Sequence, residues 1–335
     1  MATQKIMAQE VPHVSPLKSF TQGDFDRLST QHEWIKGCSG GCSGLLKAPI
    51  DLSRPGLRVL DSATADGTIT PKALFVLDSH CPRSDFLCPG TIGIWMKDVQ
   101  TLAAPGTQFV GFDIAPDPQS PLPPNIHIQA QNILEPFPSE WQNSFDLVHQ
   151  RLLLVMFSET QVHQILDRLI GTVKPGGWVQ LFEGDASKRV YNPNAKSFEF
   201  FHKFVEKMES ATVGRYLSDY LRDAGMINIG HQEVELQLGC ANPDRELGML
   251  GLRNIQSAVN GFMARFEPGA VGASEEEWRD LPEQLTRDMD TYGASGLRAE
   301  YRGGVPRACG MYTLGAAHYK NENIYKAKTN PMNAK

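Results

Sequence analysis

Short apolar runs alternate with amphipathic stretches through the first half of the chain. The runs at 58–60, 109–112, 126–129 and 145–149 are rich in β-branched and aromatic residues, which is typical of buried strands. The stretch 160–169 instead repeats its apolar residues at helical spacing. Strands that alternate with helices in this way predict an α/β fold built on a mostly parallel sheet.

The second half of the chain adds two further strands and several helices. Residues 227–238 alternate between apolar and polar positions, and 311–319 form a last apolar run. Two helical stretches, 243–264 and 274–292, separate these strands and predict an inserted helical cap over 241–300. We therefore expect a Rossmann-like sheet of seven strands, mostly parallel, with an antiparallel last strand near one edge.

Two of the predicted strands end in an acidic residue. The first ends at Asp61 and runs into small residues as far as Gly67, and the second ends at Asp113. In an open α/β sheet, ligands bind beyond the carboxyl ends of the strands, where a loop of small residues lets a cofactor lie against the backbone. The carboxylate of Asp113 is placed to accept the two hydroxyls of a ribose. The combination predicts a nucleoside site.

The loop after the first strand lacks most of the glycines of a dinucleotide fingerprint. Ala63 and Ala65 occupy the two positions of the G-x-G spacing, and only Gly67 remains. Because alanine disfavours positive φ angles, we expect a more ordinary turn than a three-glycine loop makes. A pyrophosphate would press on this loop, so the pattern favours a ligand with a small carboxylate instead.

Several short motifs occur in the order typical of one enzyme family. They are VLDSATADG, GFDI, QNI, FDLVH and VKPGGW. Together they resemble a class I S-adenosylmethionine-dependent methyltransferase. RLSTQHEW at 27–34 narrows the resemblance to the fungal branch that contains LaeA-like proteins and small-molecule methyltransferases of secondary metabolism. The similarity covers most of residues 25–320.

The resemblance implies a cofactor, S-adenosylmethionine, and the residues that bind it. The matching positions are Gln31, Asp61, Ala63, Thr64, Ala65, Gly67, Asp113, Ile114, Asn132 and Ile133. It also implies that residues 18–50 form a helical lid, in which Arg27, Gln31 and His32 close over the cofactor. Asn132 and Ile133 should flank the adenine, although Asn132 equally fits an asparagine that only stabilises a turn.

Two histidines are candidates for the catalytic base. His149 ends the fourth predicted strand, where the methyl group and its acceptor should meet, and His32 lies in the predicted lid. A base matters most for a hydroxyl acceptor and least for an amine. His149 could instead be a structural hydrogen-bond partner.

The acceptor is expected to be a small molecule, methylated at nitrogen, oxygen or sulfur. The alternative functions are a LaeA-like regulator with a protein partner and a pericyclase built on the same fold.

One departure from the family pattern is large. Gly67 and Asp113 are 46 positions apart, and removal of the 23 residues 68–90 restores the family spacing. We interpret 68–90 as an insertion at the junction between the cofactor loop and the next helix, whose first-turn amides should face a carboxylate. It is either a surface excursion or a retained intron, and it could impair activity.

Composition excludes several other classes of protein. The net charge of −6 argues against a nucleic-acid partner. No apolar run approaches the length of a membrane helix, and the chain begins without a signal-peptide pattern. The six cysteines form neither a disulfide framework nor a metal-ligand spacing, so we expect no metal and a cytoplasmic location, or a nuclear one for a LaeA-like protein. Residues 1–17 and 321–335 are predicted to be tails.

Overall fold

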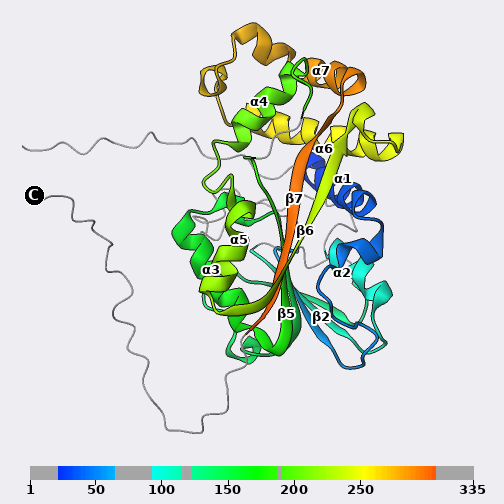
Figure 1. Ribbon diagram of the computed structural model, residues 1–335, viewed down its shortest axis with the longest axis vertical. Helices are drawn as coiled ribbons and strands as arrows, with labels where there is room; N and C mark the ends of the chain where they lie inside the picture. The colour runs from blue at the N-terminus through cyan, green and yellow to red at the C-terminus, as the bar shows by residue number, and fades with distance from the viewer. Residues whose placement is uncertain (1–21, 65–92, 115, 117–121, 188–190, 307–335) are drawn as a thin grey trace, which may run out of the picture.

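A seven-stranded sheet forms the centre of the protein, and its strands lie in the order β3-β2-β1-β4-β5-β7-β6 (Figure 1). The computed structural model describes residues 22–64, 93–114, 116, 122–187 and 191–306, with side chains described between 28 and 294. The strands are β1 (Arg58–Ser62), β2 (Gln108–Asp113), β3 (Ile126–Ala130), β4 (Phe145–Arg151), β5 (Val173–Gly184), β6 (Met226–Leu238) and β7 (Ala294–Pro306). The predicted tails lie outside the described residues.

The centre of the sheet is parallel, as the sequence predicted. β1 pairs in parallel with β2 on one side, in the register Val59↔Phe109 and Leu60↔Val110, and with β4 on the other. This pairing is confirmed. It brings the two acid-tipped strands side by side with their carboxyl ends at the same edge of the sheet.

The last strand of the described chain is antiparallel, as predicted, but comes from residues other than those expected. The predicted segment, 311–319, lies outside the described residues, and the last strand of the described chain is β7. It lies antiparallel between β5 and β6, one strand in from the edge of the sheet, which fits the expected antiparallel strand near one edge. The sequence of β7, ASGLRAEYRGGVP, is poor in strand-forming residues. It forms a strand because backbone hydrogen bonds to β5 on one side and β6 on the other outweigh its weak strand propensity.

Helices cover both faces of the sheet. They are α1 (Gln22–Cys38), α2 (Ile94–Val99), α3 (Glu159–Gly171), α4 (Lys196–Val205), α5 (Val213–Asp223), α6 (Arg245–Met263) and α7 (Glu275–Thr291), with 3₁₀ turns η1 (Cys42–Leu45), η2 (Gln100–Leu102), η3 (Ser139–Trp141), η4 (Leu154–Met156), η5 (Gly239–Ala241) and η6 (Pro268–Val271). α3 and α5 bury their apolar stripes in one core, and α1 and α2 contribute to a second core on the opposite face. Figure 1 shows these two pairs on either side of the sheet.

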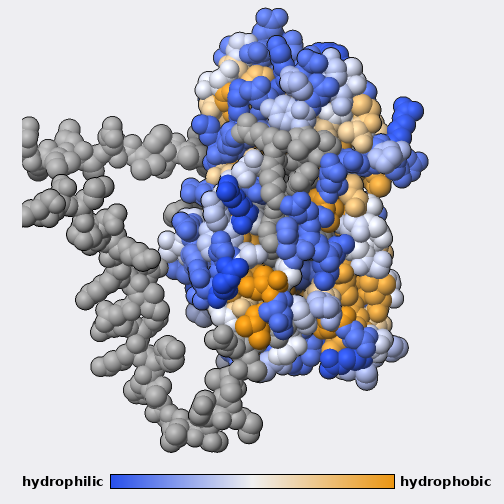
Figure 2. Space-filling model, viewed as in Figure 1, coloured by the Kyte–Doolittle hydropathy of each residue, from blue (hydrophilic) through white to orange (hydrophobic). Residues whose placement is uncertain are grey.

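A helical unit stands at one end of the molecule. α6 and α7 lie between β6 and β7 in the chain, at the two helical stretches that the sequence predicted, and pack with α4 through aromatic side chains such as Phe204, Phe262 and Trp278. Residues 294–300 of the predicted cap, 241–300, belong to β7 instead. Its surface is largely hydrophilic in the view of Figure 2. Among the described helices, none is long and apolar enough to cross a membrane.

The chain leaves and re-enters the described fold at adjacent points around the predicted insertion. Gly93 N–H donates to the carbonyl of Thr64 at 3.1 Å, and Thr64 N–H donates to the carbonyl of Phe112 at 3.1 Å. α2 then begins at Ile94. Residues 68–90 themselves lie outside the described residues. The two ends that they join are therefore held next to each other by backbone hydrogen bonds.

Deletion of residues 68–90 should consequently leave the fold intact. Five residues, 65–67 and 91–92, would remain between Thr64 and Gly93, enough to close a loop whose ends are hydrogen-bonded. Because loop-closure entropy grows only slowly with length, the melting temperature should be equal to or higher than that of the full chain. Thermal unfolding monitored by circular dichroism measures this. A fall of several degrees would show that the segment stabilises the fold.

Candidate functional site

A hollow opens at the carboxyl ends of the central strands. It encloses about 330 Å³, counted up to its open mouth, and its walls are formed by Ala63, Phe112, Asp113, Ile114, Gln131, Asn132, Ile133, Leu153 and Phe157. Five of the predicted cofactor residues lie together in this wall. Of the others, Asp61 and Thr64 are buried at the end of β1 without lining the hollow, and Gln31 lies on α1. Ala65 and Gly67 lie outside the described residues.

The acidic side of the hollow is fixed by backbone pairing between β2 and the residues that follow β3. Asp113 ends β2 and is 9% exposed, and its carbonyl accepts a hydrogen bond from Gln131 N–H at 2.8 Å. The Oδ1 atom of Asn132 accepts from Leu134 N–H at 2.9 Å, so this asparagine does stabilise a turn. Among the described residues its amide nitrogen makes no hydrogen bond, and this is the group that Asn132 can offer to a ligand.

The loop after β1 approaches β2 unusually closely. A Cβ atom on Gly111 of β2 would lie 2.7 Å from the Thr64 side chain and 2.6 Å from Met96 of α2. Glycine is therefore required at this position of β2. Thr64 is buried against β2, while Ala65 and Gly67 lie outside the described residues.

The turn at Ala63 differs from the expectation. Its φ angle is 57°, in the left-handed region that alanine disfavours, so the turn is not the ordinary one that the sequence predicted. Hydrogen bonds from the next residue, Thr64, to the carbonyl of Phe112 hold the chain in place after this turn. The fold thus keeps the geometry of a glycine turn without the glycine.

Beside the hollow, a buried hydrogen bond joins β1 to β4. His149 Nδ1 lies 2.7 Å from Asp61 Oδ1, and both residues are buried. The imidazole stacks on the indole of Trp95 from α2, with ring centroids 3.8 Å apart and planes at 2°. His149 Nε2 has no hydrogen-bond partner among the described residues.

These contacts define the protonation of His149. Because the carboxylate of Asp61 can only accept, the proton lies on Nδ1 and the lone pair on Nε2. Burial lowers the pKa of His149; Asp61 opposes this shift and Arg151 adds to it. The ring is therefore neutral near pH 7. A neutral imidazole whose buried Nε2 makes no hydrogen bond within the described residues is able to take up a proton.

His32 has a different environment. Its Nε2 lies 2.8 Å from Asp98 Oδ2 on α2, and its Nδ1 lies 3.2 Å from Arg151 Nη2 on β4. Burial and then Arg151 lower the pKa of His32 to about 3. Both nitrogens are engaged, so the geometry gives His32 the role of joining α1 to α2 and β4 and leaves it no nitrogen for a substrate proton. Gln31, its neighbour on α1, is half-buried.

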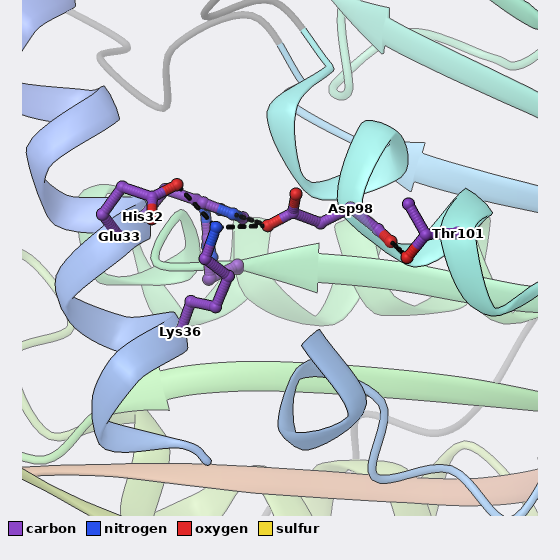
Figure 3. Close-up of polar contacts among 6 residues, drawn as sticks. His32, Glu33, Lys36, Asp98 and Thr101 are labelled. Atoms are coloured by element: carbon purple, nitrogen blue, oxygen red, sulfur yellow. Dashed lines mark hydrogen bonds and ion pairs between the residues drawn. The ribbon is translucent and has the colours of Figure 1, made fainter. Parts of the chain in front are cut away.

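Figure 3 shows His32 and Lys36 reaching from α1 towards Asp98 on α2. Ligand atoms of His32, Glu33 and Asp98 lie within 4.8 Å of one another, a spacing that a metal ion could use. However, the Lys36 ammonium lies 2.9 Å from Asp98 and 2.7 Å from Glu33. The lysine supplies the positive charge at this position, and the cluster acts as an ionic link between the two helices.

Several wall residues were missed from the sequence. Leu153 and Phe157 follow β4, and Trp95 covers His149 from α2. The position of Leu153, directly after an acid-containing strand, was the available signal, whereas nothing in the sequence pairs Trp95 with His149. Parallel strands whose carboxyl ends meet at one hollow are the arrangement in which open α/β sheets bind their ligands.

Comparison with known proteins assigns the family. No protein-family profile matches the chain. The N-methyltransferase verN of Clonostachys rogersoniana is 33% identical over 275 residues, which cover 81% of this chain and 86% of verN. The N-methyltransferase sirN of Leptosphaeria maculans is 31% identical over 259 residues, 76% of this chain and 81% of sirN. The chain therefore belongs to the family of these fungal N-methyltransferases, which confirms the methyltransferase family that its motifs predicted.

Solved structures are more distant. Phosphoethanolamine N-methyltransferase 2 of Haemonchus contortus, in complex with S-adenosylmethionine, has a TM-score of 0.45 at 15% identity, covering 86% of this chain and 58% of that chain. A likeness of this size adds nothing to the assignment.

Replacement of Ala63 by glycine should stabilise the protein. The left-handed conformation costs an L-residue roughly 1–2 kcal/mol, part of which the greater chain entropy of glycine offsets. We expect Ala63→Gly to raise the free energy of unfolding by about 0.5–1 kcal/mol in guanidinium titrations. The control is Ala103→Gly, at a φ of −97°, which should lower it. A loss of stability in Ala63→Gly would show that the turn is not strained.

Proposed function

We propose that the protein transfers a methyl group from S-adenosylmethionine to a nitrogen atom of a small molecule and so tailors a fungal secondary metabolite. The single observation that carries the proposal is the convergence of Ala63, Asp113, Asn132 and Leu153, from four different strand ends, on one hollow beside the buried Asp61–His149 pair. Nitrogen as the acceptor atom is supported by relatives named N-methyltransferases.

The walls of the hollow fit a nucleoside. Asp113 would accept the ribose hydroxyls, and Asn132 and Ile133 would flank the adenine against the apolar side formed by Leu153 and Phe157. In this proposal the methionine part follows the loop of Ala63, Thr64, Ala65 and Gly67 and lies near Asp61, while Gln31 reaches it from α1. Bound there, the cofactor supplies an already activated methyl group.

The protein's own contribution is alignment and exclusion of water. Holding the nucleophile in line with the methyl carbon can supply about 7–11 kcal/mol. α1 acts as the lid in this proposal, since the hydrogen bond of His32 and the ion pair of Lys36 to Asp98 fasten it to the helix that follows the cofactor loop. α6 and α7 form the cap on the acceptor side.

His149 is the proposed base. Asp61 fixes its ring so that the lone pair of Nε2 is available, and burial keeps the ring neutral. Nε2 takes the proton that the acceptor nitrogen must lose. The stacked Trp95 prevents rotation of the imidazole and excludes water from one of its faces. His32 is a positioning residue of the lid in this account.

Loss of the Asp113 charge should weaken cofactor binding. Hydrogen bonds to a charged acceptor contribute on the order of 1.5–3 kcal/mol, so Asp113→Asn should raise the Kd for S-adenosylmethionine at least tenfold in isothermal titration calorimetry. The matched control is Asp146→Asn at the opposite end of β4, where Asp146 accepts from Arg58 N–H and Lys174, and its Kd should match that of the wild type. If Asp113→Asn and Asp146→Asn both fold and bind S-adenosylmethionine with the same Kd, the assignment of Asp113 to the ribose is rejected.

Replacement of His149 should slow methyl transfer without weakening the binding of S-adenosylmethionine. In His149→Asn, the side-chain amide can still donate to Asp61 as Nδ1 does, but Nε2 is lost. We expect S-adenosylmethionine binding within about threefold of wild type and methyl transfer to a panel of small-molecule nitrogen nucleophiles reduced about a hundredfold. His163→Asn on α3 serves as the control. Retained turnover in His149→Asn would make His149 a structural partner of Asp61 only.

A further inference from the structure

A buried carboxyl group behind the hollow has no part in the chemistry described above. Glu183 lies at the carboxyl end of β5 and is fully buried. Its Oε1 accepts from Gln150 Nε2 at 2.7 Å and from the N–H groups of Leu153 and Leu154 at 2.8 and 2.9 Å. Oε2 has no hydrogen-bond partner within the described part of the chain. One oxygen of Glu183 therefore gathers three donors from the end of β4 and the turn that follows it.

That turn has a strained backbone. Leu152 has a φ angle of 50°, a region that leucine adopts only at an energetic cost. Its N–H donates to the carbonyl of Phe182 at 2.8 Å, which fixes one side of the turn to β5. The next residue, Leu153, forms part of the wall of the hollow. Strained backbone persists only where surrounding contacts hold it, and Glu183 supplies the contacts on the far side of Leu152.

We propose that Glu183 is a positioning residue for the cofactor, because its carboxylate holds the turn after β4 in the conformation that places Leu153 in the wall of the hollow. The inference rests on the proposed cofactor site. Hydrogen bonds to an ionised acceptor are stronger than those to a neutral one, so the ionised form of Glu183 holds the turn more tightly than the protonated form.

Ionisation of Glu183 falls in an accessible pH range. Burial raises its pKa to about 7, although the hydrogen bonds from Leu154, Gln150 and Leu153 lower it. The carboxylate is therefore the main form above pH 7 and is lost as the pH falls below 7. As the carboxylate form is lost, the binding of S-adenosylmethionine should weaken.

The groups around Glu183 leave few other sources of this pH dependence. Gln150 on β4 does not titrate, and Gly214 of α5 packs against the backbone carbonyl of Glu183. Asp185, two residues on, accepts from Ser187 through Oδ1. On β7, Glu300 is the register partner of Glu183.

The test compares Glu183→Gln with the wild type at pH 8.5 and pH 6.0. Glutamine keeps the shape and one acceptor oxygen but cannot be charged. The Kd for S-adenosylmethionine is measured by isothermal titration calorimetry, and the ratio of variant to wild type cancels the titration of the ligand itself. We expect a ratio of about ten at pH 8.5, from the difference between charged and neutral hydrogen bonds, and of about one to two at pH 6.0.

Two control variants separate this role from a general effect of buried acids. Asp288→Asn removes a buried carboxylate of the helical cap, which accepts from Ser197 N–H at 3.0 Å and Ser197 Oγ at 2.6 Å. It should give a ratio near one at both pH values. Glu300→Gln should retain the pH dependence of the wild type, since the dependence belongs to Glu183.

The inference is overturned if the ratio of the Glu183→Gln Kd to the wild-type Kd is the same at both pH values. It is also overturned if that ratio is near one at pH 8.5. Failure of the wild type to bind S-adenosylmethionine at either pH rejects the proposed function itself, and the inference with it. Should Glu183→Gln not fold, hydrogen exchange of the Leu153 and Leu154 amides in the wild type decides. Corrected for intrinsic rates, their protection should fall between pH 8.5 and 6.0, and unchanged protection overturns the inference.

Discussion

The hydrogen bond between Asp61 and His149 is the interaction on which the site depends. It joins the ends of β1 and β4 at 2.7 Å in a fully buried setting, just before both strands turn away from the sheet. Removing one partner of such a pair leaves an uncompensated polar group in the core, which costs several kcal/mol. The pair therefore fixes two strand ends relative to each other. The loop that follows β1 and the turn that follows β4 both start from this fixed point.

Both of these connections contain a residue in the left-handed region, and neither residue is a glycine. Ala63 follows β1 with a φ of 57°, and Leu152 follows β4 with a φ of 50°. Leu153, the residue after Leu152, and Ala63 both line the hollow. Strain of this kind collects at functional sites because the surrounding fold is stable enough to maintain it. Here the surrounding contacts come from Phe112, Phe182 and Glu183.

The sequence predicted those parts of the site that depend on strand ends. Parallel strands bring their carboxyl ends to one edge, and the two acid-tipped strands do pair. Asp113 lines the hollow, whereas Asp61 is hydrogen-bonded to His149. Conformations that depend on tertiary contacts could not be predicted. The φ of Ala63 is held by hydrogen bonds to β2, and β7 forms from a weak strand sequence because it is paired on both sides. The contact between Trp95 and His149 could not be predicted either, since it depends on where α2 packs against the sheet.

The central claim is that the hollow beside Asp61 and His149 holds the nucleoside of the cofactor. A crystal structure with bound S-adenosylhomocysteine tests it most directly. The account predicts both ribose hydroxyls at about 2.5–3.0 Å from the carboxylate of Asp113, with the adenine between Ile133 and Leu153. A nucleoside bound elsewhere, with the Asp113 carboxylate out of hydrogen-bond range of the ribose, would contradict it.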